Sequence, residues 1–189
     1  MRNTKSHTHE VWASLILCDR DQKRIKKFLV SDFGLKEKSV VKEMHLTVYH
    51  SRRLFRGVYP LSESASVELD VGDTRFMVMI SGGENPRVGV KPGDKRIGIR
   101  VQKRSKTRNI VDQYRSCLTA LESQDILGKR KRSTRSHNAF GAKSFQPHMT
   151  LLLPGSGIGQ DLREIGIAFR KTLGLLVFDR FSVEVSKIR

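Results

Sequence analysis

The chain has 189 residues, 38% of them hydrophobic, and is long enough to bury a core of its own, so we expect one domain over residues 1–189. The formal net charge of +17, from 36 Lys and Arg against 19 Asp and Glu, favours a polyanionic partner or substrate. Two cysteines without metal-ligand spacing, no signal-peptide pattern and no apolar run of about 18 residues argue against a disulfide framework, secretion and a membrane span. We expect a cytoplasmic monomer that does not bind membranes.

The first elements are predicted to be a strand followed by a helix. Residues 11–18, VWASLILC, form a bounded apolar run that is typical of a buried strand. Asp19 with Gln22 three residues later resembles a capping box, and apolar residues at helical spacing predict a helix over 19–33. Residues 1–10, which precede the strand, are expected to be a flexible tail.

A strand that carries a His-x-Thr motif follows this helix. In EMHLTVYH, residues 43–50, apolar side chains alternate with His45, Thr47 and Tyr49, which predicts a strand over 43–49. The middle of the chain is then predicted to be rich in strands, the first two separated by a Gly-Asp turn: 65–71, 75–81, 87–90 and 96–102.

The last part of the chain returns to helix and then to a second His-x-Thr strand. Apolar residues at helical spacing predict an amphipathic helix over 107–125. FQPHMTLLL, residues 145–153, predicts a strand over 147–153 with His148 and Thr150 on one side. A helix over 162–173 and one or two strands within 175–188 are expected to close the fold.

These elements form an internal repeat of strand, helix and His-x-Thr strand. The first copy is 11–18, 19–33 and 43–49, and the second is 96–102, 107–125 and 147–153. The second copy is about 18 residues longer, and the basic stretch 128–145 accounts for the surplus as a loop or insertion. The repeat predicts an α+β fold with a pseudo-two-fold relation between its halves.

The two motifs suit acid–base chemistry at a phosphodiester. Side chains at i and i+2 of a strand leave the same face, so His45 lies beside Thr47 and His148 beside Thr150. If a pseudo-two-fold axis relates the halves, both pairs face one groove. One imidazole would then act as base and the other as acid, with the two hydroxyls bound to phosphate oxygens, and neither a metal nor a cofactor is needed. Which histidine has which role stays open.

HLTV at 45–48 and PHMTL at 147–151 resemble the paired signatures of the two-histidine (2H) phosphoesterase superfamily, which includes 2′-5′ RNA ligase-like proteins and cyclic phosphodiesterases. This resemblance implies a bilobal α+β fold with antiparallel sheets around a central groove. It also implies metal-independent phosphodiester chemistry, with a catalytic set of His45, Thr47, His148 and Thr150.

Three substrate classes follow from these expectations. The first is an RNA end or a nucleotide, with opening of a 2′,3′-cyclic phosphate or cleavage of a 2′-5′ linkage. The second is a cyclic oligonucleotide signal, which some phage members of the superfamily hydrolyse. In the third alternative the chain is a non-catalytic module that binds RNA.

Two aromatic residues are candidates for stacking on a nucleobase. Tyr49 is expected to share a face with His45, and Trp12 lies in the strand before the first helix; either could equally belong to the core. His50 is expected on the opposite strand face and is left out of the site.

Three basic residues are candidates for phosphate contact. Arg52 follows the first motif directly, although a solvated turn is the simpler interpretation. Arg135 and Lys143 lie in the basic stretch GKRKRSTRSHNAFGAK, which could equally be a disordered loop. Its KRKR sequence would also suit nuclear localisation in a eukaryotic host.

Overall fold

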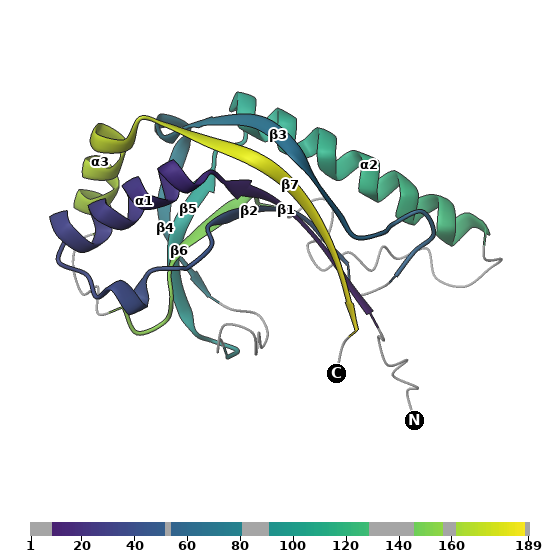
Figure 1. The fold of residues 1–189 in the computed structure, drawn as a ribbon, viewed down its shortest axis with the longest axis horizontal. Coiled ribbons are helices and arrows are strands. Elements are labelled where there is room, and N and C mark those ends of the chain that lie inside the picture. Colours follow the sequence, from purple (N-terminus) through teal and green to yellow (C-terminus); the bar gives the residue numbers. More distant parts are fainter. Residues whose placement is uncertain (1–8, 52–53, 81–90, 129–145, 157–161, 188–189) are drawn as a thin grey trace.

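The computed structural model describes residues 9–51, 54–80, 91–128, 146–156 and 162–187. In chain order the main elements are β1 (His9–Leu17), α1 (Asp19–Lys27), β2 (His45–Ser51), β3 (Leu61–Asp70), β4 (Thr74–Ile80), β5 (Lys95–Val101), α2 (Lys106–Gly128), β6 (His148–Leu152), α3 (Leu162–Leu173) and β7 (Leu175–Lys187) (Figure 1). None of the helices within these ranges combines the length and the hydropathy of a membrane-spanning helix.

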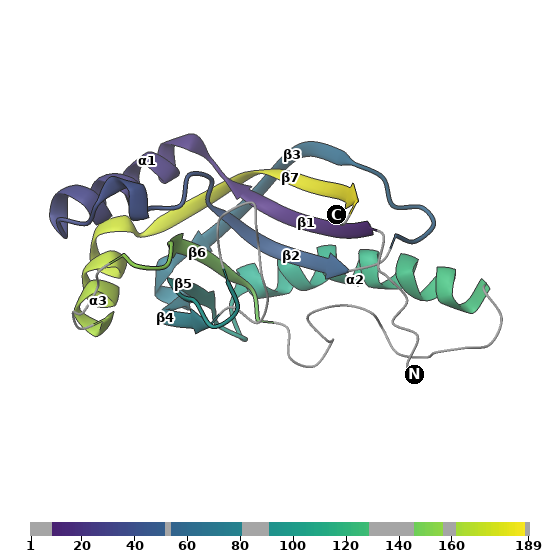
Figure 2. The same ribbon diagram turned by 90° about the horizontal axis from the view of Figure 1, so that it is seen from below.

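All seven strands join one antiparallel sheet in the order β3-β7-β1-β2-β6-β5-β4. The expected α+β class is therefore confirmed, with a single continuous sheet where separate sheets were expected. The two His-x-Thr strands, β2 and β6, are neighbours at its centre, and β1, β2 and β6 lie side by side in Figure 2. β2 also pairs with β1, the strand before α1, and β6 also pairs with β5, the strand before α2.

Most predicted elements are confirmed to within a few residues, and the differences have local causes. The predicted tail is too long because β1 begins at His9. The predicted capping box is wrong: Cys18 is the N-cap without a side-chain bond, and the Gln22 amide donates to the Leu17 carbonyl at 2.7 Å. The α-helical part ends at Lys27 and continues as a π-helical turn, Phe28–Asp32. The predicted strand 87–90 lies outside the described residues.

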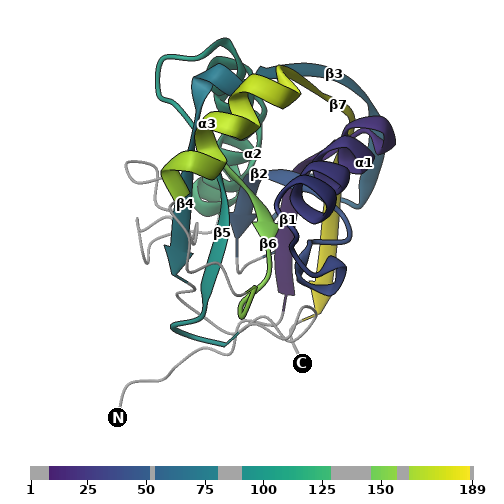
Figure 3. The ribbon, with the colours of Figure 1, turned by 90° about the vertical axis from the view of Figure 1, so that its left-hand side faces the viewer.

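The Gly-Asp turn does not join a hairpin. A 3-10 turn, Val71–Asp73, links β3 and β4, yet β3 pairs with β7 and β4 pairs with β5, at opposite edges of the sheet. Seven strands laid flat would separate these edges by about 29 Å, whereas the short connection spans at most about 14 Å. The sheet is therefore strongly bent, and Figure 3 shows β4, β5 and β6 turned at an angle to β1 and β7.

The three helices cover one face of this sheet. A row of buried apolar residues runs across six paired strands on that face: Phe76, Ile99, Met149, Leu46, Leu15 and Phe181. Phe169 of α3 packs against Phe76 with ring centroids 5.0 Å apart, and Tyr114 of α2 packs against Phe181 at 4.6 Å. Residues that alternate with this row lie on the opposite face, which we call the histidine face.

Candidate functional site

The two His-x-Thr motifs lie next to each other on the histidine face. Leu46 of β2 pairs with Met149 of β6, and both are fully buried against the helices. In an antiparallel ladder the flanking residues fall opposite one another, which places His45 across from Thr150 and Thr47 across from His148. The structure thus brings together all four residues predicted from the motifs, two from each half of the chain. Thr47 is mostly buried and the other three are half-buried.

Each histidine ring is held by a carbonyl two residues upstream. His148 Nδ1 lies 2.9 Å from the Gln146 carbonyl oxygen, and the His45 ring bonds to the backbone of Glu43. Since a carbonyl only accepts, His148 Nδ1 carries the proton, and Nε2 of the neutral ring keeps its lone pair. This tautomer leaves Nε2 of His148 ready to take a proton from a substrate.

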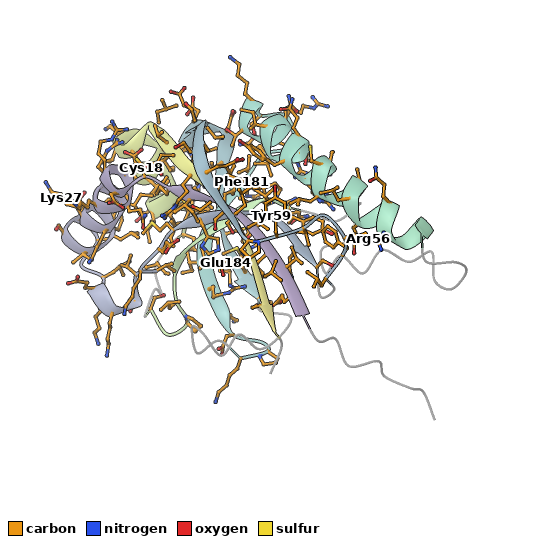
Figure 4. All side chains as sticks on the ribbon, turned by 45° about the vertical axis from the view of Figure 1, so that its right-hand side comes forward. Cys18, Lys27, Arg56, Tyr59, Phe181 and Glu184 are labelled. Atoms are coloured by element: carbon orange, nitrogen blue, oxygen red, sulfur yellow. The ribbon has the colours of Figure 1, made fainter. Side chains whose placement is uncertain are left out.

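The surroundings of His45 act on its pKa in two directions. Burial lowers the pKa below its usual value, because the charged ring loses hydration. The bond to the Glu43 backbone and the carboxylates of Glu43 and Glu184 oppose this effect, while Arg96 adds to it. Phe181 and Glu184 leave opposite faces of β7, so Glu184 lies on the histidine face (Figure 4). His45 is thus the histidine with acidic neighbours.

His148 has basic neighbours instead. Burial is the largest effect lowering its pKa, and the bond to the Gln146 carbonyl opposes it. The charges of Arg96, His45 and Arg100 lower the pKa further. The effect of His45 on His148 is consistent with the pairing of Leu46 with Met149, which places the two histidines on adjacent strands. Burial favours the neutral form of both rings; the neighbouring charges add to this effect at His148 and partly oppose it at His45.

Arg96 is a site residue that the sequence interpretation missed. It lies on β5, on the histidine face, and its charge acts on both imidazoles. Its Nε is buried without a hydrogen-bond partner among the described residues, and burial lowers the pKa of the guanidinium. An unsatisfied buried donor is costly, and a bound anion would satisfy it. The alternation of Arg96 and Arg100 in RIGIR was the available signal, because it places both on one strand face.

Gly98 lets β5 approach β6 beside the motif. It pairs with Thr150, and a Cβ at this position would lie 2.2 Å from the Met149 carbonyl oxygen and 2.7 Å from the Met79 Cε. The first contact is with backbone, which cannot move without disturbing the β5–β6 pairing. Only glycine therefore fits at position 98.

A β-bulge in β2 overturns two expectations about the site. Ala13 pairs with Tyr49 but Ser14 pairs with Thr47, so Val48 is an extra residue and the side chains change faces beyond it. Tyr49 is consequently fully buried on the helix side, where its hydroxyl donates to Glu122 Oε2 at 2.7 Å. The predicted role of Tyr49 in base stacking is therefore wrong. His50, expected on the far face, lies on the histidine face.

Trp12 lies beside the motifs on the histidine face. Its ring centroid is 4.4 Å from that of His50 and 6.5 Å from that of His45, in an edge-on arrangement. His50 Nε2 in turn hydrogen-bonds with Glu10 Oε1. Trp12 is half-buried and contacts the first motif, so it stays a candidate for contact with substrate.

The remaining predicted contacts lie outside the described residues. Arg52 falls in 52–53, and Arg135 and Lys143 fall in 129–145. Their roles, and that of the basic stretch, stay predictions.

No protein-family model matches this chain, and no curated protein matches its sequence. The resemblance to the 2H phosphoesterases therefore rests on the two motifs.

Proposed function

We propose that the protein is a phosphodiesterase that acts on RNA ends or nucleotides, with His45 and His148 as its acid–base pair. One observation carries the proposal: two His-x-Thr motifs, about a hundred residues apart in sequence, lie on adjacent strands and present their polar residues on one sheet face. The order β1-β2-β6-β5, in which each motif strand adjoins the strand before its helix, supports a pseudo-two-fold, bilobal arrangement.

Three side chains would donate hydrogen bonds to the phosphate: Thr47, Thr150 and Arg96. The hydroxyls of Thr47 and Thr150 bind non-bridging oxygens, as the motif predicts. Arg96 supplies a charged guanidinium with a buried Nε that has no partner among the described residues. A charge-assisted bond from this group stabilises the negative charge that accumulates on the phosphate oxygens in the transition state.

The two histidines divide the proton transfers according to their surroundings. In opening a 2′,3′-cyclic phosphate, water attacks phosphorus and gives its proton to Nε2 of neutral His148. The phosphorus–oxygen bond to the ribose breaks, and protonated His45 gives its proton to that oxygen. Arg96 and Arg100 favour the neutral form of His148, and Glu43 and Glu184 favour the charged form of His45.

The test is a panel of substrates incubated with EDTA: 2′,3′-cyclic nucleotides, RNA with a cyclic phosphate end, 2′-5′ oligonucleotides, and cyclic di- and trinucleotides. His45→Ala and His148→Ala should each lower the rate by about 10²–10⁴-fold. Lys171→Gln, on the exposed surface of α3, is the matched control and should retain full activity. Inactivity that only zinc or magnesium restores would contradict the mechanism.

The panel also separates the alternative functions. Turnover of cyclic di- or trinucleotides alone would identify a hydrolase of cyclic oligonucleotide signals. A non-catalytic module would bind RNA without turnover, and both histidine variants would bind as tightly as the unaltered protein.

A further inference from the structure

Two arginines continue the histidine face from the proposed reaction site to the edge of the sheet. Arg100 of β5 pairs with His148 of β6, and Arg75 of β4 pairs with Arg100, so the three residues form one row across three strands. Their chain neighbours Ile99 and Phe76 belong to the core row, which places all three polar side chains on the histidine face. Figure 3 shows β6, β5 and β4 as successive strands.

The positive charge of this row is not neutralised within the described part of the chain. No ion pair there joins a carboxylate to Arg75, Arg96 or Arg100. Arg100 is half-buried and Arg75 is exposed on an edge strand. Two strand spacings separate β4 from β6, about 10 Å, so one phosphate bound at His148 leaves Arg75 for a second anionic group.

Towards β1 and β7, the histidine face carries different charges. There the β1–β7 side carries the carboxylates of Glu10 and Glu184, the indole of Trp12 and one arginine, Arg180, whose guanidinium lies 3.9 Å from Glu43 Oε1. A phosphate placed on that side would meet carboxylates and one arginine that already pairs with Glu43, whereas one placed over β5 and β4 would meet two guanidiniums with no carboxylate partner in the described part of the chain. Charge complementarity thus gives the substrate a direction on the sheet.

We propose that Arg100 and Arg75 form a second phosphate subsite, and that the substrate is an oligonucleotide whose next phosphate lies over β5 and β4. The proposal rests on the proposed function for the reacting phosphate and adds the class of substrate. Guanidiniums bind phosphate oxygens in bidentate geometry without reading the base, so the subsite selects for chain length and not for sequence.

The test compares kcat/KM for three substrates with the same 2′,3′-cyclic end: a mononucleotide, the mononucleotide with a 5′-phosphate, and a trinucleotide. We expect the two substrates with extra phosphate to be preferred by about tenfold or more, the usual effect of a hydrogen bond to a charged group. Arg75→Gln should lower this ratio severalfold and make it less dependent on salt. Lys171→Gln removes the same charge from the helix side and should leave the ratio unchanged.

Equal kcat/KM for all three substrates, or an equal fall in the ratio for both variants, would overturn the second subsite while the proposed function stands. Failure to turn over any cyclic phosphate would instead count against the proposed function. In that case calorimetric binding of the 5′-phosphorylated trinucleotide still decides about the subsite: Arg75→Gln must weaken binding more than Lys171→Gln does. Equal weakening there would overturn the proposal.

Discussion

The substitution Arg96→Gln tests the site at the residue whose charge reaches both histidines. Glutamine keeps an amide donor of smaller reach and removes the positive charge. A hydrogen bond from a charged group to a substrate oxygen is worth about 1.5–3 kcal/mol, so kcat/KM for a cyclic phosphate should fall by about 10- to 150-fold. Because Arg96 lowers the pKa of His45 and of His148, both values should rise in the variant.

The free energy of unfolding of Arg96→Gln should be equal to or higher than that of the unaltered protein. Arg96 has a buried Nε without a partner among the described residues, and burial disfavours its charge. Removing that charge relieves a cost of folding, as is common where a site sacrifices stability for function. The midpoint of thermal unfolding should therefore be unchanged or higher, which distinguishes a lost phosphate contact from a damaged fold.

The assay combines steady-state kinetics with NMR titration of the histidine Cε1 protons. Arg100→Gln is the matched control, because Arg100 lies opposite His148 and lowers the pKa of that ring. Arg96→Gln should raise both histidine pKa values, and Arg100→Gln mainly that of His148. Unchanged pKa values and unchanged kcat/KM in Arg96→Gln would refute its assigned position close to both rings.

Three further variants test the support of the site. Gly98→Ala should cost about 1–3 kcal/mol in urea unfolding and lower activity, since the new methyl group would meet the Met149 carbonyl; a fully stable, active variant would contradict this packing. Tyr49→Phe removes a donor to the buried Glu122 carboxylate and should lower the free energy of unfolding by about 1–3 kcal/mol. Because Tyr49 is not on the histidine face, kcat should be retained at low temperature. A loss of kcat without a loss of stability would contradict this placement. For Asp21, burial raises the pKa but hydrogen bonds from Arg20, Arg24 and the Val177 N–H outweigh it and lower the pKa to about 2. Its stabilisation is therefore present above about pH 4 and lost as the pH falls towards 2, and Asp21→Asn should cost about 1–2 kcal/mol near neutrality and flatten this acid limb in unfolding experiments.

Local alternation explains why the sequence predicts the four motif residues on one face. His45 and Thr47 flank Leu46, and His148 and Thr150 flank Met149, so burial of the apolar residue fixes the direction of its neighbours. The rule fails directly after Thr47, because Val48 is an extra residue and the side chains beyond it change faces. Nothing in HLTVYHS marks Val48 as that residue, since the residues around it suit a strand equally well.

Alternation along a strand does not predict which distant strands pair with each other. The Gly-Asp turn was located correctly, but β3 and β4 go to separate edges because their partners, β7 and β5, are chosen by packing elsewhere. The same limit applies to Arg96 and Arg100. Their common face is visible in RIGIR, whereas their position beside His148 depends on the pairing of β5 with β6.

A crystal structure of the protein with bound inorganic phosphate tests the central claim most directly. The account predicts one phosphate on the histidine face, with a ring nitrogen of His45 and Nε2 of His148 each within about 2.6–3.2 Å of its oxygens, and the Arg96 guanidinium bound to a further oxygen. A phosphate that contacts only one of the two rings, or that binds away from them, would contradict it.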